Sequence, residues 1–221
     1  MYNGKKLLSN RKNIMSDRYW LTPDQARRFR LIGALFLVAA LVMLPVIVFA
    51  GLTPGASPYC GGEGCLWVSK PASLLSQEIR LQVEATAETR AVFAAYVDRS
   101  EVRLGLAAIE AVVSVPYALL LACVGLALRR LGGPTDAALV EALRWLKRAS
   151  GAAVVWALAS PVHETLLESF LSPGTPTGPV FQIVVNLAYL ATPLLLALAA
   201  YSVTWAIETA LRKQHELDGF V

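Results

Sequence analysis

Charged side chains are scarce in this chain, and those present are unevenly spread. Of 221 residues, 16% are charged and 56% are hydrophobic, with a mean hydropathy of +0.52, whereas soluble domains carry about 25% charged residues. Four long stretches hold at most two charges each: 31–59, 104–128, 150–171 and 169–207. This shortage excludes an ordinary soluble domain and indicates a bilayer environment.

Histidine is nearly absent, with two residues in the whole chain. His163-Glu164 resembles the start of an H-E-x-x-H zinc site, which needs a second histidine four residues after the first. Leu167 stands there, and the other histidine, His215, belongs to the predicted C-terminal tail. The histidine count therefore does not support a zinc protease or a bis-histidine haem. No phosphate loop or nucleophile motif is present either, so the sequence predicts neither an enzyme nor a bound metal or cofactor.

The apolar stretches are long enough to cross a membrane, which takes about 20 residues for about 30 Å of hydrocarbon. We predict an all-α integral membrane protein with four transmembrane helices, at about 31–52, 104–128, 151–171 and 180–207. The first could instead be a signal peptide cleaved after Ala50. The hydrophilic segment of about 30 residues before it and its long apolar run favour an uncleaved anchor.

Lysine and arginine gather on one side of the predicted spans. Eight lie in residues 1–30 and five between Arg129 and Arg148, but none lies between Ser172 and Pro179. By the positive-inside rule both termini face the cytoplasm. The domains are a basic cytoplasmic segment (1–30), a four-helix membrane domain (31–207) with an outer loop (53–103), and a cytoplasmic tail (208–221). Nucleic-acid binding is the weaker interpretation of the basic N-terminus, because no nucleic-acid motif appears.

Two flanking segments carry local structural signals. Thr22-Pro23-Asp24-Gln25 is typical of a helix start, with Thr22 as the cap and Gln25 completing a capping box. In the outer loop, residues 71–102 contain good helix formers and no internal Gly or Pro after Pro71, so we predict one amphipathic helix there.

Cys60 and Cys65 lie in the predicted outer loop, where an oxidising compartment favours a disulfide. A zinc or redox site is the alternative, but it lacks further cysteines nearby and C-x-x-C spacing.

Ionisable side chains within the spans are the best pointer to function, because such groups are costly at membrane depth and tend to pair or line a cavity. At about 1.5 Å per residue, Glu110 on the second span and Glu164 on the third fall at about the same level in the outer half of the bilayer. The predicted polar cluster consists of Glu110, His163, Glu164 and Glu168, with Arg103 as counter-charge and Gln182 and Asn186 completing the network by hydrogen bonds. It either binds a proton, cation or ligand, or fixes helix packing.

Residues 100–221 resemble a bacterial inner-membrane family known as domain of unknown function 2975. The resemblance rests on the leucine- and arginine-rich stretch 142–149 and on the basic-acidic tail 208–221, while the family's glycine-rich turn is partly matched by 132–136. It implies a four-helix topology in the bacterial inner membrane and adds no catalytic residue.

Two functions remain open at this point. The first is a non-enzymatic regulatory or assembly role with a membrane-protein partner or a second copy of the chain, favoured by the small size and mostly short loops. The second is a small proton- or cation-coupled transporter that uses Glu110, Glu164 and Glu168. The lipid bilayer is a partner in both, and nucleic acid in neither.

Overall fold

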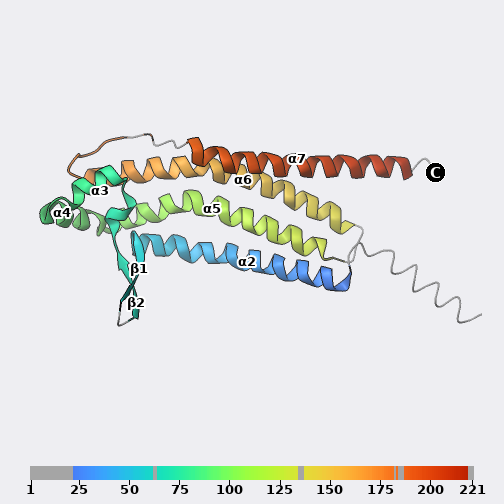
Figure 1. The fold of residues 1–221 in the computed structure, drawn as a ribbon, viewed down its shortest axis with the longest axis horizontal. Coiled ribbons are helices and arrows are strands. Elements are labelled where there is room, and N and C mark those ends of the chain that lie inside the picture. The colour runs from blue at the N-terminus through green and yellow to red at the C-terminus, as the bar shows by residue number, and fades with distance from the viewer. Residues whose placement is uncertain (1–21, 62–63, 134–136, 182, 184–186, 219–221) are drawn as a thin grey trace, which may run out of the picture. The chain divides into compact units, whose positions relative to one another are not determined.

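The structure is a computed structural model that describes residues 22–61, 64–133, 137–181, 183 and 187–218. This part of the chain is mainly helical (Figure 1), as the predicted all-α class requires. Its α-helices are α2 (Pro23–Leu52), α3 (Gln77–Glu84), α4 (Ala87–Val97), α5 (Ser100–Leu131), α6 (Ala137–Leu171) and α7 (Leu187–Asp218). Shorter elements are the strands β1 (Ala56–Gly61) and β2 (Gly64–Ser69) and the 3-10 helices η1 (Pro71–Leu74) and η2 (Ser172–Gly174).

Three helical stretches among the described residues are long and apolar enough to cross a membrane: α2, α5 and Leu190–Thr209 within α7. The chain therefore has the character of a membrane protein. Helix α6 contains the predicted third span but is not among the three. Its apolar stretch is interrupted near the C-terminal end by His163, Glu164 and Glu168.

Helix α2 starts as its sequence predicts. The backbone N–H of Gln25 donates to Thr22 Oγ1 at 3.4 Å, and the N–H of Thr22 donates to Gln25 Oε1 at 3.1 Å. This reciprocal capping box is confirmed, and it satisfies two backbone donors that a helix end leaves free.

The fourth span was predicted to begin as a helix at about residue 180, and this is wrong. Helix α7 begins at Leu187. Val180, Phe181 and Ile183 lie outside any helix. The segment that follows Pro179 is rich in β-branched residues, whose side chains lose freedom in a helix.

The described chain forms two compact units, each built from several segments. The first unit comprises the described residues within 22–40, 119–152 and 196–218. In it α2 and α5 approach closely at Gly33 and Gly125, where a Cβ on Gly33 would lie 2.6 Å from the Gly125 carbonyl oxygen. Arg30 donates from Nε and Nη2 to the carbonyl of Gly132, at 2.8 and 2.6 Å. Small residues thus allow backbone contact between helices, as is common in membrane proteins.

The second unit comprises residues 41–118 and 153–195 and contains the outer loop. The prediction of one helix over 71–102 is wrong, since η1, α3 and α4 are separate elements and α5 begins at Ser100. Thr86 explains the break between α3 and α4, because its Oγ1 accepts from the N–H of Thr89 at 3.1 Å and caps a new helix. Cap residues of this kind offer the backbone an alternative to continued helix.

The hydrophobic core of the second unit lies where the outer-loop helices pack on the ends of α5 and α6. Phe93 and Val97 of α4, Val83 of α3 and Leu171 of α6 are almost completely buried there. Tyr96 Oη donates to the carbonyl of Phe170 at 3.0 Å and ties α4 to the end of α6. The outer loop is therefore a folded cap on these helices.

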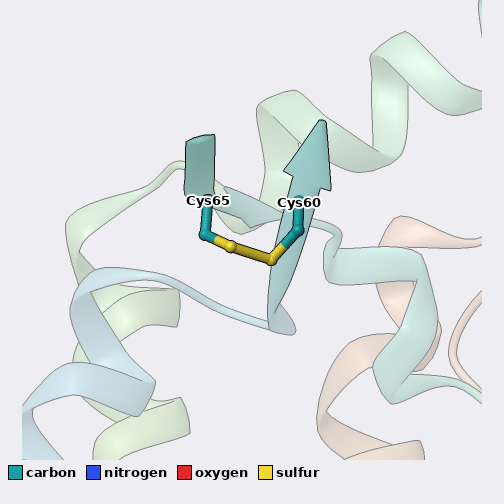
Figure 2. Close-up of a disulfide and its surroundings, with 2 residues drawn as sticks. All are labelled: Cys60 and Cys65. Atoms are coloured by element: carbon teal, nitrogen blue, oxygen red, sulfur yellow. A yellow bond between two sulfur atoms is a disulfide. The ribbon is translucent and has the colours of Figure 1, made fainter. Parts of the chain in front are cut away.

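The antiparallel hairpin β1–β2 was not predicted. In its register Cys60 is directly opposite Cys65, with 4.0 Å between the Cα atoms. Figure 2 shows the disulfide that joins the two strands, so the predicted Cys60–Cys65 bond is confirmed.

Candidate functional site

Helices α5 and α6 pack antiparallel in the second unit, and three contacts define their register. The Phe170 ring lies against Gly105, His163 lies against Glu110, and the rings of Trp156 and Tyr117 are 5.2 Å apart between centroids. Successive contacts are five to seven residues apart on α5 and seven apart on α6. Residues seven apart lie on one helix face, so Trp156, His163 and Phe170 share one face of α6, and their three contacts form the seam between α6 and α5.

Glu110 has two partners within this seam. Its Oε2 lies 3.4 Å from His163 Nε2, and its Oε1 accepts a hydrogen bond from Ser114 Oγ at 2.8 Å. The side chains of His163 and Glu110 are 20% and 28% exposed, and Ser114 is buried. Both carboxylate oxygens are thus engaged between the helices, which lowers the cost of a charged group at this position.

The end of α2 gives a reference point for the position of Glu110 along α5. Gly51, near that end, packs against Arg103 and Ala107 of α5. Glu110 is three residues beyond Ala107, which amounts to about 5 Å along the helix. The Glu110–His163 pair therefore lies about one helical turn inside the C-terminal end of the apolar stretch of α2.

Arg103 does not serve as the counter-charge of Glu110, and that prediction is wrong. Its Nη2 pairs with Asp98 Oδ1 at 2.6 Å, at the junction of α4 and α5. Helical side chains lean toward the N-terminus of their helix, so Arg103 reaches back toward Asp98 and away from Glu110. The Nε of Arg103 is buried and has no hydrogen-bond partner among the described residues.

The other two glutamates of α6 lie apart from the pair. Glu164 is exposed, and within the described chain no hydrogen bond or ion pair engages it. Glu168 instead lines a separate small cavity of about 120 Å³ next to α3. The residues that line this cavity are Ser76, Glu78, Ile79, Gln82, Glu168, Ser172, Thr177 and Val180.

The structure thus brings together two members of the predicted cluster, Glu110 and His163, and separates Arg103, Glu164 and Glu168 from them. Gln182 and Asn186 lie outside the described residues. Ser114 was missed, although its position four residues after Glu110 on one helix face was a readable signal. Within the described segments, no three side chains of the metal-ligating types come together.

The chain matches no protein-family model, no curated protein and no solved structure. The resemblance of residues 100–221 to domain of unknown function 2975 stays an expectation.

Proposed function

We propose that this chain is a four-span protein of the bacterial inner membrane, with both termini in the cytoplasm. It acts as a non-enzymatic regulatory or assembly component together with a membrane partner. The separation of the three carboxylates is the observation that carries the proposal.

The proposal needs one span besides the three long apolar helices. This is the predicted third span along the chain, in the C-terminal half of α6. Residues 156–170 of α6 lie beside residues 105–117 of α5, which is itself apolar and long enough to cross a membrane. A helix that packs along a spanning helix occupies the same layer of the bilayer. The Glu110–His163 and Glu110–Ser114 contacts then account for Glu110, His163 and Ser114 at that depth.

The proposed orientation is supported by charge and by the disulfide. Arg30, Arg130 and Lys147 belong to the first unit, together with most of the basic residues that flank the spans. The Cys60–Cys65 bond belongs to the second unit, near the opposite end of α2 and α5. Basic flanks favour the cytoplasm, and a disulfide favours the oxidising outer side.

A carrier needs a continuous polar path, and the carboxylates of the described residues do not form one. Glu110 is held between α5 and α6, Glu168 lines the cavity beside α3, and Glu164 is exposed on α6. An exposed carboxylate within a span is costly against lipid. An assembly partner that covers this part of α6 removes that cost, which favours assembly over transport.

Site-specific photocross-linking in native membranes tests the assembly role. A photoreactive phenylalanine analogue replaces one residue at a time: Glu164 or Ser160, four apart on one face of α6, and Leu41 of α2 as the control, which is 65% exposed. We expect a discrete protein adduct, with a second copy or another membrane protein, from the α6 positions and lipid adducts alone from Leu41. Lipid adducts alone from both helices would contradict the proposal.

A further inference from the structure

The outer hairpin, Ala56–Ser69, is apolar on both of its faces. The register pairs Leu66 with Tyr59 and Trp67 with Pro58, and as neighbours in one strand Leu66 and Trp67 lie on opposite faces. Leu66 is 72% exposed and Trp67 is 64% exposed, and Glu63 is the only charged residue from 53 to 69. A two-stranded hairpin is marginally stable in water, so these exposed apolar side chains call for an apolar environment.

The position of Trp67 identifies that environment. Its ring makes an edge-to-face contact with Phe49, at 5.6 Å between centroids and 80° between planes. Phe49 is three residues from the end of α2, and its neighbours Val48 and Leu52 are 59% and 61% exposed. The surface of the outer hairpin is thus continuous with the exposed apolar surface of a helix that can cross the membrane.

We propose that the outer hairpin is an interfacial anchor that binds the lipid surface of the outer leaflet. Figure 1 shows the hairpin leaving the end of α2 across the helix axis rather than along it. Trp and Tyr concentrate at the level of the headgroups. Among the described residues the sheet has two strands, so each strand keeps one edge without a β partner. Such edges are excluded from hydrocarbon but are satisfied by water and headgroups. The outer hairpin therefore lies in the interface and not in the hydrocarbon.

The disulfide holds this anchor in shape. It joins Cys60 and Cys65 beside the turn, one residue before Leu66 and two before Trp67 (Figure 2). A one-residue slip of the register would turn every side chain to the other face. The disulfide prevents the slip and keeps Trp67 beside Phe49.

Fluorescence quenching in vesicles tests the anchor on the full chain. The protein is reconstituted in phosphatidylcholine vesicles whose acyl chains carry bromine either near the headgroup or near the chain end. The Trp67 signal is taken as the difference between the wild type and Trp67→Phe, so that the other tryptophans stay in place. We expect stronger quenching by the shallow bromine than by the deep one, and little quenching by aqueous iodide.

Two outcomes would overturn the anchor. Quenching by iodide without quenching by bromine would place Trp67 in water, and protection from both would place it against protein.

Leu66→Asp should remove most of the shallow quenching, because a charge opposes entry into the interface. Leu81→Asp, at a leucine of α3 that is 61% exposed, is the matched control and should leave the quenching unchanged. Equal effects of both substitutions would contradict the anchor.

Discussion

The contact between Glu110 and His163 predicts an energetic coupling between α5 and α6 that a double-mutant cycle measures. The four proteins are the wild type, Glu110→Leu, His163→Leu and the double variant. His163→Leu leaves Glu110 with Ser114 as its remaining partner (Oγ to Oε1, 2.8 Å). Glu110→Leu frees Ser114 to bond to the helix backbone.

The geometry sets the expected size of the coupling. Breaking a fully buried pair by removing one partner costs about 3–5 kcal/mol. Here the two side chains are 20% and 28% exposed and the N–O distance is 3.4 Å, longer than the roughly 2.8 Å of a strong charge-assisted bond. We therefore expect His163→Leu to cost about 2–3 kcal/mol, Glu110→Leu about 1 kcal/mol, and the coupling to be about 1–2 kcal/mol.

The assay is unfolding in mixed micelles by titration with sodium dodecyl sulfate, followed by circular dichroism. Glu164→Leu is the matched control, because Glu164 is a neighbouring glutamate on α6 that is exposed. Glu164→Leu should leave the free energy of unfolding unchanged or raise it, because an exposed carboxylate within a span is costly in an apolar phase. Additive effects of Glu110→Leu and His163→Leu would show that the pair does not hold the helices together, and the reasoning would fail.

Further substitutions test three other contacts by the same unfolding assay and, for the disulfide, also by proteolysis. Gly33→Ala should lower the free energy of unfolding by about 1–3 kcal/mol, since the new Cβ would lie 2.6 Å from a backbone oxygen. Gly151→Ala is the control, because a Cβ there meets nothing within 4 Å, and it should be neutral or stabilising. Equal costs of the two substitutions would contradict close packing at Gly33. Tyr96→Phe should cost about 1 kcal/mol by removing one hydrogen bond, and an unchanged stability would refute that bond. Replacing Cys60 and Cys65 by serine should speed proteolysis within the hairpin and leave the main transition unchanged; a large shift of that transition would show that the hairpin supports the core.

Several parts of the fold could be predicted from residues that lie close together in the sequence. The capping box of Thr22 and Gln25 and the cysteine pair could be read directly, because each depends on residues close together in the chain. The hairpin also had a signal, an apolar run at 66–68 after a glycine-rich turn, which is typical of paired strands. The disulfide was predicted there without the two strands that it joins.

The outer-loop helix shows where composition misleads. Residues 71–102 contain good helix formers throughout, but Thr86 begins a new helix with its side chain. Cap chemistry at one residue therefore outweighed the propensity of its neighbours.

The candidate site depended on the direction of side chains as well as on their level along the helix. Depth along the helices matched Glu110 with Glu164, and the structure places His163, one residue away, beside Glu110. Arg103 was assigned to Glu110 by its spacing on one helix face, yet its side chain leans toward Asp98. Which residue of a helix turn faces a neighbouring helix depends on packing, which spacing alone does not fix.

Proton flux through the reconstituted protein tests the central claim most directly. Wild-type protein and Glu110→Gln are placed in vesicles that enclose a pH-sensitive dye, and an ion gradient with valinomycin supplies the driving force. If Glu110 and His163 hold helices together, both proteins give the flux of empty vesicles. A wild-type flux above that level, abolished by Glu110→Gln in a protein of unchanged stability, would contradict the account and establish a carrier.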